Sequence, residues 1–145
     1  MLAGKKVIVI ITGGIAAYKS LELVRKLKDK GVKVIPVMTK AAENFVTPMS
    51  VSALSQEKVY NELFDLTDEA EMGHIELSRS ADLIVVVPAS ADFIAKTATG
   101  QANDLASTII LATDTKVLMA PAMNVRMWDN LLTQKNIKTL NENRY

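Results

Sequence analysis

The chain has 145 residues, of which 49% are hydrophobic, enough for one domain with a buried core. The 17 Lys and Arg residues balance 16 Asp and Glu residues, which argues against nucleic acid or an anionic membrane as a partner. The sequence has no cysteine and a single histidine, so it excludes disulfides and thiolate sites and predicts no metal centre. No apolar run reaches the roughly 20 residues of a membrane span, and the run after Lys5-Lys6 is short for a signal peptide, so a cytoplasmic protein is expected.

The N-terminal part of the chain predicts a βαβ unit. Val7 to Ile11 is an unbroken β-branched run, typical of a parallel strand buried on both faces. A Thr-Gly-Gly turn ends it, residues 15–30 have the apolar spacing of a helix, and Gly31 is a typical C-terminal cap. Residues 32–38 are the second expected strand and complete the unit.

The turn at Gly13-Gly14 is the first candidate ligand contact. Glycines let the backbone approach a ligand at the amino end of a helix, where unpaired N–H groups and the helix dipole favour a phosphate. The pattern is not G-x-G-x-x-G, and no acidic residue ends the second strand, which argues against an NAD site. Thr39-Lys40 follows that strand instead and adds a hydroxyl and a cation.

The middle of the chain is less regular. Residues 41–56 predict helical pieces divided at Pro48, with Ser50 or Ser52 as the cap of the second piece, and residues 57–64 predict a short edge strand. His74 stands where a short helix begins. A lone histidine is more often structural than catalytic, and its place before a central strand is what makes His74 a candidate.

Residues 83–87 form the most strand-like run of the chain. The segment Pro88-Ala89-Ser90-Ala91-Asp92-Phe93 follows, in which small residues leave room for a flat ligand and Ser90 suits a helix N-cap. That helix is expected to run to Gly100. Asn103-Asp104-Leu105 is expected to cap a further helix over residues 105–112, and residues 117–120 are the next expected strand.

The segment Pro121-Ala122-Met123-Asn124-Val125-Arg126-Met127-Trp128 joins this strand to an amphipathic helix. On its own it is most simply a helix N-cap at Asn124 followed by packing residues. The carboxyl ends of parallel strands meet at one edge of a sheet, so this segment and the turns after residues 11, 38 and 87 should gather there. The sequence therefore predicts a three-layer α/β/α doubly wound parallel sheet, Rossmann-like, with one ligand crevice at that edge.

Four segments resemble the homo-oligomeric flavin-containing cysteine decarboxylases, most closely their phosphopantothenoylcysteine decarboxylase branch. They are Gly13–Lys19, Gly73–Ile75, Pro88–Asp92 and Pro121–Trp128. The resemblance covers nearly the whole chain, and the last two segments in this order are its most specific part. It implies FMN as the cofactor, a role in coenzyme A biosynthesis, and assembly into a homo-trimer or a dodecamer.

The resemblance also implies roles for particular residues. The residues that bind FMN would be Gly13, Gly14, Ile15, Thr39, Ser90, Ala91, Asp92, Phe93 and Ala122. His74 would be the catalytic base. Asn124 and Met127 would bind the substrate, 4′-phosphopantothenoyl-cysteine, and Asn124 would hold the carboxylate of that substrate. Many relatives have Asn and Thr where this chain has Asp92 and Phe93. Because a carboxylate disfavours a nearby phosphate, Asp92 is expected to cap its helix or contact the flavin ring or ribityl chain.

The family's chemistry explains why a flavin is needed. A β-thiol acid has no electron sink for decarboxylation. FMN takes a hydride from the carbon that bears sulfur, and the resulting thioaldehyde delocalises the electrons released with CO2. Asn124 would orient the carboxylate by neutral hydrogen bonds, which stabilise its charge less than an arginine would.

The departure from the family that matters most concerns a cysteine: pantetheine-forming relatives use one beyond the last strand to reduce the product, and this sequence has none. The resemblance therefore implies a single FMN-binding decarboxylase domain over residues 1–145, lacking its C-terminal strand and cysteine-bearing segment, with at most the oxidative half-reaction. Two alternatives stay open. One is a related flavoprotein with another substrate, a peptidyl-cysteine decarboxylase or a flavin prenyltransferase; Gly13-Gly14-Ile15 and Asn124 disfavour the prenyltransferase. The other is a non-catalytic flavin-binding regulatory subunit, which would have no need of His74.

Overall fold

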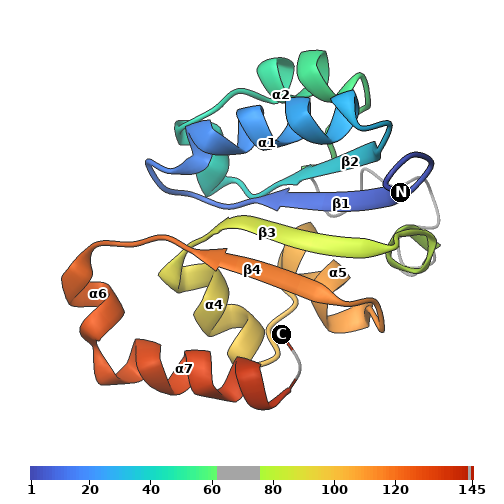
Figure 1. Cartoon of the computed structure of the whole chain (residues 1–145). Helices are drawn as coiled ribbons and strands as arrows, with labels where there is room; N and C mark the ends of the chain where they lie inside the picture. Colours follow the sequence, from blue (N-terminus) through green and yellow to red (C-terminus); the bar gives the residue numbers. More distant parts are fainter. Residues whose placement is uncertain (62–75, 144) are drawn as a thin grey trace.

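Four parallel strands form one sheet in the order β2-β1-β3-β4 (Figure 1). The computed structural model describes residues 1–61, 76–143 and 145. The strands are β1 (Lys6–Ile11), β2 (Lys33–Met38), β3 (Leu83–Ala89) and β4 (Val117–Pro121). In the register, Val7 pairs with Val34 on one side and Leu83 on the other, and Ile84 pairs with Val117. The carboxyl ends of all four strands therefore lie at the same edge, as predicted.

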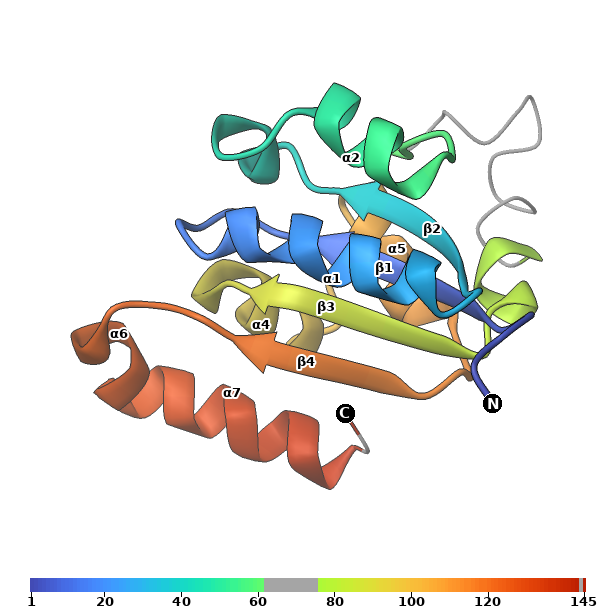
Figure 2. The same cartoon turned by 45° about the horizontal axis from the view of Figure 1, so that its top comes forward.

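Helices cover both faces of the sheet and give the predicted three layers. Both cartoon views show α1 (Ala17–Asp29) and α2 (Pro48–Ser55) on one face, and α4 (Ala91–Ala98), α5 (Leu105–Ala112) and α7 (Leu131–Glu142) on the other (Figures 1 and 2). The 3-10 helix η1 (Ala41–Asn44) and the short helix α6 (Val125–Asp129) follow the carboxyl ends of β2 and β4. Residues 76–80 are also helical and lead towards β3.

The sheet separates two hydrophobic clusters because alternate side chains of a strand point to opposite faces. Ile8 and Ile10 of β1 pack with the α4, α5 and α7 side, whereas Val9 and Ile11 pack with the α1 and α2 side, and all four are 0% exposed. The unbroken apolar run of β1 is thus explained by burial on both faces, as the sequence predicted.

The end of α1 is fixed by a Schellman motif, which confirms the predicted cap at Gly31. The Gly31 N–H donates to the Lys28 carbonyl at 2.9 Å, and the Val32 N–H donates to the Leu27 carbonyl at 3.1 Å. Gly31 has a φ of +80°, which an L-residue with a side chain rarely adopts.

Two of the predictions for residues 41–64 are wrong. The N-cap of α2 is Thr47, whose hydroxyl accepts the Ser50 N–H at 3.0 Å, so neither Ser50 nor Ser52 is the cap. The predicted division at Pro48 is confirmed, because η1 ends before it and Pro48 lies in the first turn of α2, where its missing N–H loses no helical hydrogen bond. Within the described part of residues 57–64, only an isolated bridge forms, between Val37 and Tyr60.

The strand and helix ends at the carboxyl edge also differ from the prediction. β3 continues through Pro88 to Ala89, where the sequence suggested that it stopped at residue 87. The chain after Asn124 forms two helices because Asn130 adopts an extended conformation, ends α6 and caps α7 through the Leu132 N–H at 2.9 Å. Among the residues that the structure describes, no helix is both long enough and apolar enough to cross a membrane.

Candidate functional site

The cavity at the carboxyl edge lies where the strand order reverses. The chain passes from β1 outwards to β2 and returns to β3 on the other side of β1, and ligands of open α/β sheets bind at such a switch point. A cavity of about 660 Å³ opens there. Its lining residues come from the turn after β1, the β2 turn with η1, the β3 turn with α4, and the N-cap of α5: Thr12, Gly13, Gly14, Thr39, Lys40, Ala41, Asn44, Phe45, Ser90, Asp92, Phe93, Lys96 and Asp104.

The turn after β1 has two glycines for two different reasons. A Cβ on Gly13 would lie 2.7 Å from the Cβ of Ala41, so the close packing of η1 against this turn requires the missing side chain. A Cβ on Gly14 would meet no atom within 4 Å, but the residue has a φ of +151°. Gly13 is therefore needed for space, and Gly14 for backbone conformation.

The turn after β3 is held by its serine. The Ser90 hydroxyl accepts the Phe93 N–H at 3.1 Å, which confirms the predicted N-cap of α4. Phe93 is 2% exposed and anchors the first turn of α4 in the core. Beside it, Thr39 of the β2 turn is nearly buried and accepts the Ala42 N–H at 3.3 Å. The amino ends of α1 and α4 thus converge on the cavity, and each carries a partial positive charge.

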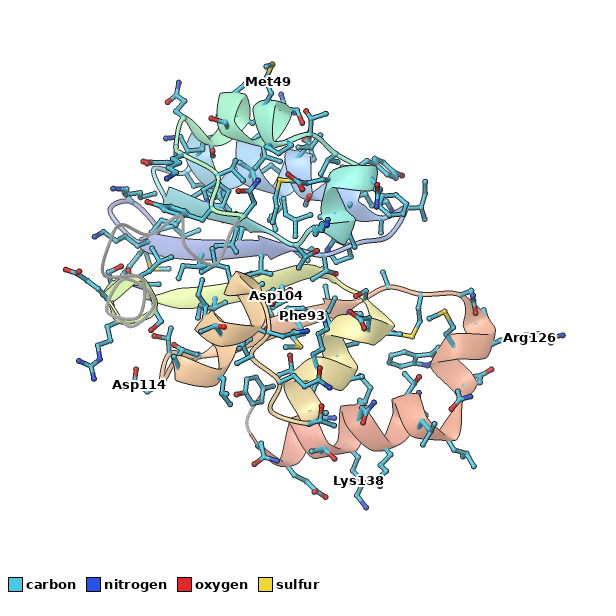
Figure 3. The ribbon with its side chains drawn as sticks, turned by 180° about the vertical axis from the view of Figure 1, so that it is seen from behind. Met49, Phe93, Asp104, Asp114, Arg126 and Lys138 are labelled. Atoms are coloured by element: carbon cyan, nitrogen blue, oxygen red, sulfur yellow. The ribbon has the colours of Figure 1, made fainter. Side chains whose placement is uncertain are left out.

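Two cations, Lys40 and Lys96, and two carboxylates, Asp92 and Asp104, line the cavity. Lys96 forms an ion pair with Asp92 at 3.4 Å, one helical turn away. Asp104 accepts the Ser107 N–H at 2.8 Å within the capping box of α5. Figure 3 shows Phe93 and Asp104 close together, and both line the cavity. Lys96 offsets the charge of Asp92, and the carboxylate of Asp104 is hydrogen-bonded within its own helix. These residues therefore repel a bound anion less than two free carboxylates would.

The segment after β4 approaches the same edge and is tied to β3. The Ala122 N–H donates to the Ala89 carbonyl at 3.1 Å. Asn124 caps α6, since its Oδ1 accepts the Met127 N–H at 2.9 Å. This cap fixes which way the amide faces, and within the described part of the chain Nδ2 donates no hydrogen bond. Asn124 therefore presents a hydrogen-bond donor, whereas Arg126 of the same helix points outward (Figure 3).

The predicted site residues fall into three groups. Lining the cavity are Gly13, Gly14, Thr39, Ser90, Asp92 and Phe93. Near the same edge but outside the lining are Ile15, Ala91, Ala122, Asn124 and Met127, of which Ile15 is 79% exposed and Met127 44% exposed. His74 lies outside the described residues, so its role stays a prediction.

Several lining residues were not singled out from the sequence. Lys96 was detectable, because a lysine four residues after Asp92 on a helix predicts an ion pair. Thr12 directly precedes the glycine pair, but nothing in the sequence indicates its partners. Asn44 and Phe45 reach the cavity only because η1 folds back over the β1 turn, which depends on tertiary packing.

The whole chain, residues 1–145, matches the model of the Flavoprotein family, and the chain belongs to this family. It is 53% identical over 139 residues to the coenzyme A biosynthesis bifunctional protein CoaBC of Vibrio vulnificus, and 52% identical over 139 residues to that of Escherichia coli K12. These matches cover 96% of this chain but 35% and 34% of the relatives, so the chain spans about a third of their length.

Solved structures agree with this assignment. The FMN-dependent cysteine decarboxylase SpaF superposes with a TM-score of 0.93 at 29% identity, covering 100% of this chain and 83% of SpaF. A PPC decarboxylase mutant complexed with pantothenoylaminoethenethiol superposes with a TM-score of 0.80 at 31% identity, covering 95% of this chain and 78% of that protein. The fold and the resemblance predicted from the sequence are both confirmed.

Proposed function

We propose that this chain binds FMN in the cavity between β1 and β3 and catalyses the oxidative decarboxylation of 4′-phosphopantothenoyl-cysteine in coenzyme A biosynthesis. The observation that carries the proposal is the cavity itself. It lies at the switch point of a flavoprotein fold, between two helix amino ends, with the Asn124 segment beside it. The names of the similar proteins support the choice of substrate.

The lining residues fit a flavin mononucleotide. A volume of about 660 Å³ is within the ~300–1,000 Å³ range of small-molecule pockets. The phosphate fits the Gly13-Gly14 turn, where the close approach of Ala41 and the φ of Gly14 require glycines, and the first turn of α4. Phe45 and Phe93 supply apolar lining for a flat ring. FMN, when bound, supplies the hydride acceptor that this substrate needs.

The residues of the chain would position the substrate. The Asn124 amide, with its oxygen engaged in the α6 cap, would donate from Nδ2 to the substrate carboxylate. A neutral donor orients this group without strongly stabilising its charge, so loss of CO2 is hindered little. On the resemblance, His74 would accept the thiol proton, for which a reference pKa near 6.5 is suited.

The test is an anaerobic visible spectrum of the FMN-loaded chain before and after 4′-phosphopantothenoyl-cysteine is added, followed by product mass analysis. Bleaching of the flavin, with a product lighter by CO2 and two hydrogens, is the expected result. A flavin that stays oxidised with this substrate but bleaches with a peptide ending in cysteine would move the assignment to a peptidyl-cysteine decarboxylase. A bound flavin that neither compound bleaches would favour the regulatory subunit.

A cytoplasmic location and assembly into a homo-trimer or a dodecamer belong to the same proposal, and so does a single decarboxylase domain over residues 1–145. The resemblance to homo-oligomeric relatives supports the assembly. Size-exclusion chromatography with light scattering, with and without FMN, measures it directly. A monomer under both conditions would contradict this part of the proposal.

A further inference from the structure

The backbone pairing between β1 and β3 stops before either strand reaches the cavity. The β1–β3 register ends at Ile10 and Val86, and the β3–β4 register shifts between Val86 and Ala89. Pro88 has no N–H to contribute to a ladder. The two central strands therefore need another connection at the edge where their turns form the cavity.

The side chain of Thr12 makes that connection. Its Oγ1 donates to the Pro88 carbonyl at 2.5 Å and accepts the Ser90 N–H at 2.9 Å, so one hydroxyl bonds β3 on both sides of Ala89. Thr12 is 1% exposed, so water does not readily replace these bonds. Because Thr12 directly precedes Gly13 and both bonds lead to the Ser90 turn, the hydroxyl sets the spacing between the two turns that line the cavity.

We propose that Thr12 is a positioning residue of the flavin site, whose hydroxyl holds the Gly13-Gly14 turn and the Ser90 turn at the separation that FMN requires. The proposal rests on the proposed function, since it assigns FMN to this cavity. Without the hydroxyl, FMN must itself bring the turns together, and the apparent dissociation constant is the intrinsic constant divided by the fraction of molecules that already have the right spacing. If one molecule in about ten keeps that spacing, the dissociation constant rises about tenfold.

The test is the FMN dissociation constant of the 145-residue chain, measured by quenching of flavin fluorescence, for wild type, Thr12→Val and Thr12→Ser. Valine keeps nearly the same shape and removes the hydroxyl, whereas serine keeps the hydroxyl. The matched control is Thr97→Val, because the Thr97 hydroxyl donates to the Phe93 carbonyl at 2.9 Å within α4 but does not line the cavity. The visible circular dichroism of the bound flavin at saturation and the thermal unfolding of each apo-protein are recorded in parallel.

We expect the FMN dissociation constant of Thr12→Val to rise at least about tenfold, with an altered dichroism of the bound flavin. The dissociation constants of Thr12→Ser and Thr97→Val should change less than about threefold. Unchanged affinity in a folded Thr12→Val protein would overturn the proposal. Equal losses in Thr12→Val and Thr97→Val that follow their unfolding temperatures would also overturn it, because the effect would then be general destabilisation. Wild-type protein that binds no FMN would contradict the proposed function instead.

A second variant covers the case in which Thr12→Val does not fold. Thr12→Cys has a side chain of similar size with a weak donor, and the chain contains no other cysteine to pair with it. An affinity for FMN that is weaker in Thr12→Cys than in wild type, and that is at the wild-type level in Thr12→Ser, supports the proposal. Wild-type affinity in Thr12→Cys would overturn it.

Discussion

The close contact between Gly13 and Ala41 predicts a specific loss of stability and a specific rescue. In Gly13→Ala the new Cβ would lie 2.7 Å from the Ala41 Cβ, about 1 Å inside the ~3.5–4.0 Å separation at which two carbon atoms attract. The φ of Gly13 is not in the left-handed region, so the backbone itself tolerates alanine. The cost is therefore overpacking, about 1–3 kcal/mol in the free energy of unfolding.

Ala41→Gly should rescue Gly13→Ala in part. It removes the atom at 2.7 Å, but the carbonyl carbon and oxygen of residue 41 remain at 3.3 and 3.4 Å from the new Cβ. Ala41→Gly alone is expected to cost about 0.5–1 kcal/mol through backbone entropy. The double mutant should thus be more stable than the sum of the single changes predicts, with a coupling energy of about 1 kcal/mol or more.

Urea unfolding of the four proteins measures this coupling, and FMN titration of the same proteins should rank them in the same order. Gly14→Ala is the matched control, since Gly14 has a φ of +151° but open space around it. The loss of stability in Gly14→Ala comes from backbone strain, so Ala41→Gly should not restore it. Additive effects of Gly13→Ala and Ala41→Gly would refute the close packing of η1 on the β1 turn.

Further substitutions separate the roles of individual cavity residues. Asn124→Asp and Asn124→Ser both keep an oxygen that can cap α6, so both should fold and bind FMN. Both should lose decarboxylation at least about 100-fold, because an aspartate carboxylate has no donor and the shorter serine hydroxyl does not reach the position of Nδ2, and wild-type turnover in single-turnover mass analysis would contradict the role of Asn124. Ser90→Ala should lower the free energy of unfolding by about 1 kcal/mol through loss of the α4 cap; an unchanged urea midpoint would contradict it. Asp92→Asn should leave Lys96 without its partner and strengthen FMN binding a few-fold at low salt, an effect that ~0.5 M salt removes. Weaker FMN binding in Asp92→Asn would instead indicate that this carboxylate contacts the flavin ring or ribityl chain.

Local sequence features predicted most of the fold because each carries its own physical cause. The β-branched run of β1, the Gly31 stop of α1 and the caps at Ser90 and Asp104 were correct, since side-chain hydrogen bonds and burial fix them within a few residues. The cap of α2 was missed because Thr47, Ser50 and Ser52 all suit a cap, and only the position of Pro48 in the first turn decides between them.

The site was only partly predictable, because its walls come from segments that are distant in sequence. The glycine pair and the Ser90 turn were found from their own chemistry. The bonds of Thr12 to residues 76 and 78 positions away could not be inferred, since a threonine after a strand has no sequence signal for its partner. The contact of Gly13 with Ala41 depends in the same way on how η1 packs.

Amide hydrogen exchange with and without FMN tests most directly whether FMN occupies the cavity at the β1–β3 switch point. The chain has an internal comparison, a second hollow of about 550 Å³ lined by Thr113, Asp114, Thr115, Lys116, Val117, Asn143 and Tyr145. FMN should slow exchange in the Gly13-Gly14 turn and in the first turn of α4, and leave residues 113–117 unchanged. Protection confined to residues 113–117, or saturable FMN binding without protection of the two turns, would contradict the account.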